Sequence, residues 1–291
     1  MDLLSTALNS WQFYLISYLV FVVIFYQSYK AAVKNAQRDG AATIVLQIIG
    51  ATSILVLAPF FAFSFTNSIN LWGLLIAASI FYALNDRINT TARKHLPVST
   101  YSIISQMTTV FLMIIGFLVF KENLMINKVI GGALIVLWNV VLAYKKGGFV
   151  INKYFGLALL ATLIISIAMS IDIGISKQFD LAVYISLTLG VPALMIMGAE
   201  RIKLEEVKRE YNSPDKKFYW ITGISWGLTI ISLLRAYQLG EVTTIVPLSA
   251  TSTLINVLVA YVIFNEREDH LKKVLAAILV VVGITFTVYQ L

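Results

Sequence analysis

Long apolar runs dominate this chain of 291 residues. Ten of them reach about 18–24 residues, the length an α-helix needs to cross the hydrocarbon core of a bilayer. They lie near 11–30, 41–64, 70–92, 97–120, 127–144, 154–176, 180–199, 217–238, 242–264 and 271–290. Only short connections separate them, so we predict an all-α membrane protein with ten transmembrane helices. The longer connection at 200–216 carries both signs of charge and is predicted to form a surface helix.

Composition agrees with lipid as the solvent and excludes several functions. The chain is 59% hydrophobic and 13% charged, against about 45–50% and about 25% in soluble domains. It has no cysteine and only His95 and His270, too few ligands for a thiolate or histidine metal centre. Its net charge of +7 is spread over short connections, which does not indicate nucleic-acid binding. We predict no cofactor, no metal and no enzymatic activity, because the spans hold neither paired acids nor a Ser–His arrangement.

An internal repeat divides the chain into two halves. Shifting the sequence by 144 positions, without a gap, places ten residues of the first half on identical residues of the second. These ten are Ala92, Val98, Thr100, Ser105, Thr109, Phe120, Glu122, Lys128, Ala133 and Val136. We therefore predict two five-helix repeats, 1–145 and 146–291. Because five is odd, the two copies cross the membrane in opposite senses, and inverted repeats of this kind place a central cavity where the halves meet.

A stripe of polar side chains follows the third predicted span. Tyr82, Asn85, Asp86 and Asn89 are spaced at i, i+3, i+4 and i+7, which puts them on one helix face. Polar groups facing hydrocarbon cost several kcal/mol, so this face is expected to point inward. Asp86 has two interpretations. It couples transport to a proton or cation, or it makes an interhelical hydrogen bond or ion pair.

Further candidates come from the spans that the repeat relates to each other. The fourth and ninth spans carry matched hydroxyl and amide stripes, which indicate either a shared cavity lining or helix packing. Aromatic side chains in the first and eighth spans could stack on a substrate or anchor at the interface. Pro247 removes a backbone hydrogen bond inside the ninth span. The resulting bend is interpreted either as a moving gate or as a static kink. The cavity candidates, beyond the third-span stripe, are Gln106, Thr109, Ser252, Asn256, Tyr14, Tyr18 and Trp226.

The remaining charged residues within or at the ends of the spans are expected to have structural roles. Asp172, beside Lys177, is expected near interfacial water, and Glu122 and its repeat mate Glu266 are expected to order loops. Of the Lys and Arg residues, only Arg87 and Arg235 are placed so that they could serve in the cleft. With so few cations, the cleft is expected to suit a zwitterionic or neutral solute rather than a nucleotide sugar or phosphate.

The pattern of spans and motifs resembles the drug/metabolite transporter superfamily, and within it the EamA-like branch. It runs from Ala92 through Phe120-Lys121-Glu122 to Gly131-Gly132-Ala133, and recurs from Ala236 through Phe264-Asn265-Glu266 to Ala276-Ala277. The resemblance implies a basket of helices in which helices one, three, four, six, eight and nine line a central cavity. It also implies transport of amino acids, related metabolites, nucleotide sugars or drugs. The family usually has a proline in helix four, and here only helix nine keeps one, as Pro247.

From these observations we predict a secondary transporter, an exporter or exchanger of a small polar or amphipathic metabolite such as an amino acid. A drug or lipid-carrier translocator of the same fold and a non-transporting scaffold are the alternatives. The expected partners are the small-molecule substrate, the bilayer, and a proton or counter-substrate, with the protein a monomer or homodimer in the plasma (inner) membrane. The related small multidrug resistance proteins use a glutamate in their first helix. No acid occurs in that span here, so only Asp86 could replace it.

The distribution of Lys and Arg generates a prediction of orientation. Seventeen of the 22 lie in the connections after odd-numbered spans, and short cytoplasmic loops are enriched in Lys and Arg. Both termini should therefore be external, although many members of the resembled family have cytoplasmic termini. A reporter fused after Leu291 should give signal only in an assay of the external compartment. A cytoplasmic signal would reverse the orientation.

Overall fold

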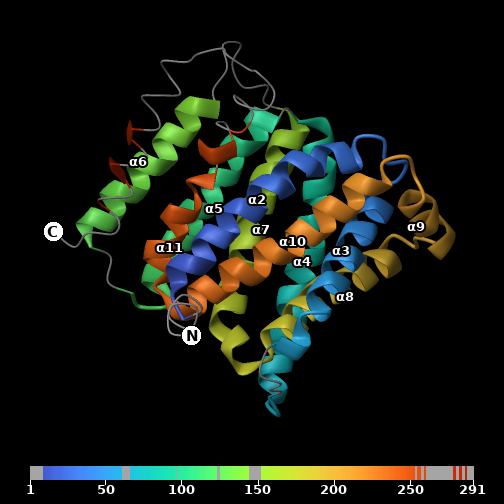
Figure 1. Ribbon diagram of the computed structural model, residues 1–291, viewed down its shortest axis with the longest axis horizontal. Coiled ribbons are helices and arrows are strands. Elements are labelled where there is room, and N and C mark those ends of the chain that lie inside the picture. Colours follow the sequence, from blue (N-terminus) through green and yellow to red (C-terminus); the bar gives the residue numbers. More distant parts are fainter. Residues whose placement is uncertain are drawn as a thin grey trace.

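The computed structural model describes residues 9–60, 66–96, 98–122, 125–143, 152–252, 254–256, 259, 278–279, 282–283 and 286. Within these ranges the chain is helical and contains no strand (Figure 1). The first half forms α2 (Trp11–Val33), α3 (Asp39–Leu55), η1 (Ala58–Phe60), α4 (Ile69–His95), α5 (Val98–Leu118) and α6 (Ile126–Ala143). The second half forms α7 (Lys153–Ile175), η2 (Ser176–Gln178), α8 (Leu181–Ala199), α9 (Leu204–Tyr211), α10 (Lys216–Leu239) and α11 (Val242–Ser249).

The membrane-spanning prediction is supported most directly by four of the described helices. The segments Trp11–Val33, Ile69–His95, Lys153–Gln178 and Leu181–Ala199 are long and apolar enough to cross a bilayer. The charged connection forms α9, as predicted. The tenth predicted span, 271–290, lies almost entirely outside the described residues.

Two of the predicted spans contain a break, and each break lies near a proline. The second was expected to reach residue 64, but α3 ends at Leu55 and is followed by a turn and by η1, which contains Pro59. The ninth was expected to be continuous, but α11 ends at Ser249, a turn occupies 250–251, and the described residues 252 and 254–256 are helical again. Proline lacks the N–H that would continue the helical ladder, and its ring crowds the preceding turn.

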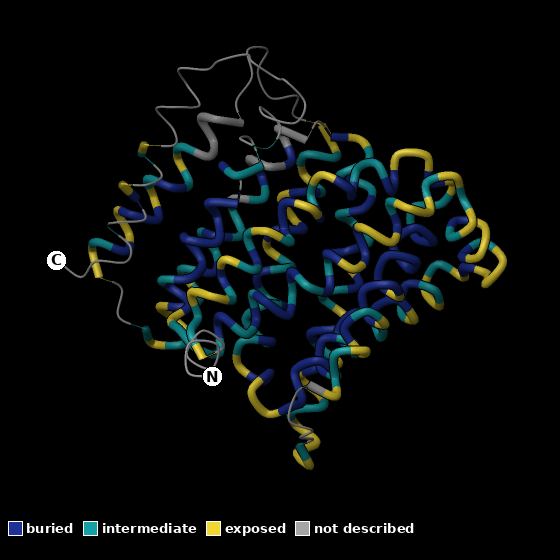
Figure 2. The backbone as a smooth tube through the Cα atoms, viewed as in Figure 1, coloured by how far each residue is buried: buried dark blue, intermediate teal, exposed yellow. Residues whose placement is uncertain are grey.

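The helices are apolar on the outside and polar on the inside. In α4, Ile76, Ile80 and Leu84 recur every four residues and are 47–51% exposed, which makes an apolar outer stripe. The same helix buries Asn85 and Asp86 on another face. Figure 2 shows buried backbone towards the middle of the bundle and exposed segments at its edges. A soluble protein arranges these faces the other way round, so the outward stripes are suited to lipid.

Packing crosses between the two halves. The helix α2 packs along α10, and α7 packs along α4. Since α2 and α7 open the two halves and α4 and α10 are their third helices, each first helix pairs with the third helix of the other half. The helix α3 packs against α8 and α10. In Figure 1, α6 and α9 lie at opposite ends of the bundle's long dimension.

A glycine pair sets the closest approach between α3 and α10. A Cβ added to Gly227 would lie 2.6 Å from Cγ1 of Ile54 and 3.0 Å from the carbonyl oxygen of Gly50. A Cβ on Gly223 would lie 2.6 Å from Cγ2 of Ile49. Small residues at helix interfaces let backbones approach closely within membranes. The two glycines of Gly223-x-x-x-Gly227 therefore form the face of α10 that contacts α3.

We expect Gly227→Ala to destabilise the protein by about 1–3 kcal/mol, because the new methyl group overpacks the contact with α3. The measurement is thermal or denaturant unfolding of the purified protein in detergent. Gly73→Ala is the matched control, since that glycine is also helical and a Cβ there would meet nothing within 4 Å. Equal stability of the two variants would contradict the close approach.

Candidate functional site

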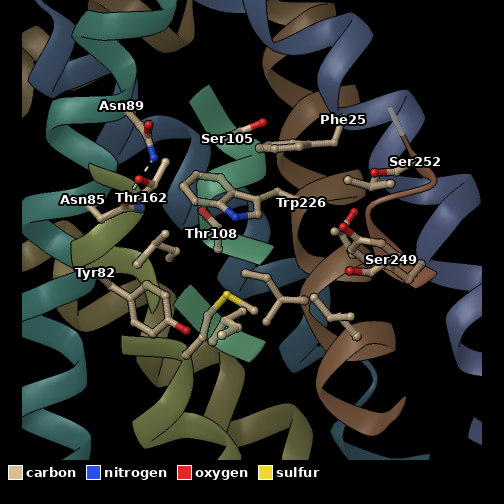
Figure 3. A pocket seen from close by; sticks show the side chains of 18 of the residues that line it. Phe25, Tyr82, Asn85, Asn89, Ser105, Thr108, Thr162, Trp226, Ser249 and Ser252 are labelled. Atoms are coloured by element: carbon tan, nitrogen blue, oxygen red, sulfur yellow. Dashed lines mark hydrogen bonds between the residues drawn. The ribbon is translucent and has the colours of Figure 1, made fainter. Parts of the chain in front are cut away.

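A cavity of about 240 Å³ lies between the helices of both halves. Its lining comes from α2, α4, α5, α7, α8, α10 and α11, and from residues directly after α11. Figure 3 shows Trp226 near the middle of the cavity, with Asn89, Ser105 and Phe25 towards one end and Tyr82 towards the other. The site therefore depends on tertiary packing, because no single helix supplies more than part of its wall.

The inward face of α4 supplies a continuous polar row. Tyr82, Asn85, Asp86, Asn89 and Arg93 all line the cavity. Their positions i, i+3, i+4, i+7 and i+11 keep them on one side of a helix that rises about 1.5 Å per residue. The row therefore extends over three turns of α4 and carries both an acid and a base.

A chain of hydrogen bonds joins this row to α3 and α5. The Tyr101 hydroxyl donates to Oδ1 of Asn89 at 2.5 Å, and the Asn89 amide donates to Oδ1 of Asn85 at 2.9 Å. The Asn85 amide then donates to Oδ1 of Asp86 at 2.8 Å, while the Gln47 amide donates to the other oxygen of Asp86 at 2.8 Å. We call this series the amide chain. All of its donors to Asp86 are neutral.

The carboxylate of Asp86 has no cation as a hydrogen-bond partner among the described residues, and it is only 5% exposed. Its neighbour Gln47 is fully buried, and the side-chain oxygen Oε1 of Gln47 lacks a hydrogen-bond partner in the described part of the protein. A primary amide offers both a donor and an acceptor. Rotation of the Gln47 amide would therefore let its oxygen accept a hydrogen bond from the O–H of a protonated Asp86, so these two residues can satisfy both states of the acid.

A second acid, Asp172 of α7, lines the same cavity. It accepts a hydrogen bond from the Tyr82 hydroxyl at 2.6 Å and another from the Tyr184 hydroxyl at 2.6 Å. The sequence interpretation placed Asp172 near interfacial water beside Lys177. Instead it is 2% exposed and held by tyrosines of α4 and α8. The only sequence signal for this position was an acid within an apolar run.

Arg93 was missed as a cavity residue because the third span was expected to end at residue 92. The helix α4 continues to His95, and Arg93 lines the cavity. Its guanidinium carbon lies 4.1 Å from the ring centroid of Tyr101 and 4.8 Å from those of Tyr26 and Tyr29. The ring of Phe25 is 5.5 Å away. We call these four rings the aromatic cage.

The two arginines assigned to spans by sequence are absent from the described lining. Arg87 makes an ion pair with Glu200. Arg235 donates to Oε1 of Gln238 at 3.0 Å and lies 6.0 Å from the ring of Tyr14. Both arginines thus interact with protein groups away from the cavity, and the cavity arginine is Arg93.

Eight of the sequence candidates meet at the cavity. They are Tyr18, Tyr82, Asn85, Asp86, Asn89, Thr109, Trp226 and Ser252. Tyr14 instead packs against the neighbouring hydrophobic core, and Asn256 accepts a hydrogen bond from Gln27 at 3.3 Å. The side chain of Gln106 lies outside the described part of the structure. Pro247 is buried within α11. The roles proposed for all of these residues stay predictions.

Ion pairs connect the helix ends on the side of the bundle where α4 finishes, which we call the basic end. Arg38 pairs with Glu206 of α9 at 2.7 Å, and Lys94 of α4 pairs with Asp39 of α3 at 2.8 Å. The backbone N–H of Lys203 and the guanidinium of Arg38 hold the pKa of the Glu206 carboxyl below its usual range. The carboxylate of this pair therefore stays ionised at neutral pH.

A different contact holds the opposite side, which we call the capped end. The Glu122 carboxylate accepts hydrogen bonds from the backbone N–H groups of Val242 and Thr243, at 2.9 and 2.8 Å. An acid at a helix N-terminus satisfies free N–H groups and complements the helix dipole. The loop-ordering role predicted for Glu122 is thereby confirmed, as a cap on α11 of the other half. Glu266 lies outside the described residues.

Comparison with known proteins shows a shared fold. No protein-family model and no curated protein sequence matches the chain. Twenty-nine solved chains match it in structure. One of them, described only as "Crystal structure of protein", superimposes with a TM-score of 0.72 at 14% sequence identity, over 94% of this chain and 95% of that one. This likeness establishes that the helical arrangement occurs in an experimentally solved protein.

Single cysteines can test whether the cavity holds water, because the native chain has none. We expect Thr108→Cys to react with a charged thiosulfonate reagent supplied on both sides of reconstituted vesicles, since Thr108 lines the cavity. Ile114→Cys is the control on the same helix, at an outward position that is 49% exposed and apolar. A charged reagent does not enter hydrocarbon. Failure of both cysteines to react would indicate a dry cavity.

Proposed function

We propose that this protein is a secondary transporter that exports or exchanges a small polar or amphipathic metabolite, such as an amino acid, by alternating access. The observation that carries the proposal is a cavity that brings Asp86, Asp172 and Arg93 into a largely apolar and aromatic lining, inside helices whose outer faces are apolar. Intramembrane polar and ionisable residues are expensive, and they commonly mark a substrate or ion pathway. A scaffold without transport would have no use for an acid, a base and an amide chain around one hollow.

The packing between the halves supports an inverted-repeat architecture. The pairs α2–α10 and α7–α4 exchange under the 144-residue shift that relates the two halves of the sequence. The pair α3–α8 maps onto itself under the same shift. This is the contact pattern expected of two copies related by an approximate two-fold axis. In transporters built this way, rocking of one repeat against the other exposes the central site to alternate sides.

We further propose membership of the drug/metabolite transporter superfamily, in its EamA-like branch. All six helices that the resemblance assigns to the lining contribute residues to the cavity: α2, α4, α5, α7, α10 and α11. Residues of α8 join them. The arrangement of the helices supports the proposed membership, whereas the Phe-x-Glu unit at 120–122 adds no cavity residue. Its Glu122 instead caps a helix of the other half.

The size and chemistry of the cavity favour a metabolite over a larger molecule. Its volume of about 240 Å³ is below the roughly 300–1,000 Å³ of pockets for drug-sized ligands. Its wall combines aromatic rings with hydroxyl and amide groups, which suits a solute that is polar at one side and apolar at another. A drug or lipid-carrier translocator remains the alternative function, and it requires a lateral opening between helices.

Flux into proteoliposomes tests the proposal directly. We expect saturable movement of at least one member of a panel of amino acids and small polar metabolites, with a pH gradient changing its rate. In Asp86→Asn the response to the pH gradient should be lost, because an asparagine amide cannot take up and release a proton. Asp86 can do so, since its hydrogen-bond donors are neutral and no cation holds it ionised through a hydrogen bond. Protein-free vesicles give the background rate.

Glu205→Gln is the matched control, since it removes an exposed carboxylate from α9 and should leave flux unchanged. An unaltered pH response in Asp86→Asn would remove this acid from the coupling mechanism without touching the transport proposal. Absence of saturable flux for the whole panel would count against transport of small metabolites.

A further inference from the structure

We propose that Arg93 in its aromatic cage binds the carboxylate of the transported solute, and that this solute is a small zwitterion whose ammonium group faces the acids of the cavity. The inference rests on the proposed function and names its substrate class. It starts from the position of Arg93, which lines the cavity together with Asp86 and Asp172.

Arg93 differs from three nearby cations of the basic end. Arg38, Arg87 and Lys94 each make an ion pair with a glutamate or an aspartate. Lys94 is adjacent to Arg93 in the chain, yet only Lys94 has a carboxylate partner. Among the residues that the structure describes, no acid forms an ion pair with Arg93. A cation placed inside a membrane protein is costly without a counter-charge, and a bound anion would supply one.

The partners of Arg93 in the cage carry no negative charge. The closest ring, that of Tyr101, has its centroid 4.1 Å from the guanidinium carbon, and the guanidinium also hydrogen-bonds the side chains of Tyr26 and Tyr101. A guanidinium has five N–H donors, so two tyrosine partners leave donors for the oxygens of a carboxylate. The cage therefore positions the group without neutralising its charge.

The number of cations limits the charge of the ligand. Arg93 is the only Lys or Arg among the described residues of the cavity wall. Phosphate groups and nucleotide sugars carry more negative charge than one guanidinium balances, and the two aspartates would repel them. One carboxylate is the anion that fits. The two aspartates can then receive a cationic group, since their protein partners are neutral amides and hydroxyls.

The spacing of the charges suits a small molecule. Arg93 lies seven residues after Asp86, about 10 Å along the helix axis. Side chains in a helix lean towards its N-terminus, so the long Arg93 side chain extends back towards Asp86 and shortens this gap. In Figure 3 the cage residue Phe25 and Asn89 lie towards one end of the cavity, away from Tyr82. The carboxylate end of the solute is thus assigned to the cage, and its ammonium end to the acids.

Protection of a cavity cysteine measures binding separately from flux. In the Thr108→Cys protein, the probes are L-leucine, L-phenylalanine, L-threonine and L-glutamine, each compared with its carboxamide, which lacks the carboxylate. We expect at least one amino acid to slow labelling of the cysteine, and its carboxamide to need at least about tenfold higher concentration. This comparison requires no change at Arg93, so folding of an arginine variant cannot confuse it.

Variants then assign the effect to one side chain. Arg93→Gln should raise the half-protective concentration of that amino acid at least about tenfold and leave that of the carboxamide nearly unchanged. Arg93→Lys should fall between, because lysine keeps the charge but not the planar fork. Arg209→Gln, an exposed arginine on α9, is the control and should match the unmodified background.

Three outcomes would overturn the assignment. They are equal protection by an amino acid and its carboxamide, unchanged protection in Arg93→Gln, and no protection by any of the four amino acids. Saturable flux of uncharged solutes together with any of these results would leave the transport proposal standing while rejecting the carboxylate site. Absence of flux together with carboxylate-dependent protection would reject the transport proposal and leave the carboxylate site standing.

Discussion

The structure depends on one constraint: lipid offers no hydrogen bonds, so every polar group in a span must find its partner inside the protein. The outward stripe of α4 therefore consists of Ile76, Ile80 and Leu84, while its polar residues turn inward. Seven helices bring such inward faces together, and their polar groups satisfy one another across helix boundaries.

The amide chain places the acid and the base of α4 in one connected system. Tyr101 stacks on Arg93 and also donates to Asn89, and the series continues through Asn85 to Asp86. A ligand that moved the Tyr101 ring would alter the first of these hydrogen bonds. Binding at the cage and protonation at Asp86 therefore act on the same set of contacts, which is the physical requirement for coupling one to the other.

Sequence reasoning found the parts of the site that helical periodicity controls and missed those that depend on packing. Tyr82, Asn85 and Asp86 followed from spacing alone, because one inward face fixes all three. Gln47 and Asp172 gave no comparable pattern, since each is a single polar residue in an apolar run whose partner comes from another helix. Arg93 was missed for a different reason. Element boundaries are the least reliable part of a prediction from sequence. The helix α4 extends three residues beyond the predicted end of its span, so Arg93 lies in the helix and lines the cavity instead of lying in a loop.

The contacts at the two ends of the bundle differ, and this difference bears on how the halves could move. At the basic end, pairs between charged side chains join α4 to α3 and to Glu200, the residue after α8. At the capped end, Glu122 of one half binds the first backbone N–H groups of α11 in the other. Lys128 of α6 also makes an ion pair there with Glu241, the residue before α11, and a turn follows α11 soon after Pro247. Ion pairs near water exchange partners at small cost, whereas a cap on a helix terminus moves only with its helix. If the halves rock, α11 and the Glu122 loop must therefore move together as one unit, with the bend after Pro247 absorbing the change.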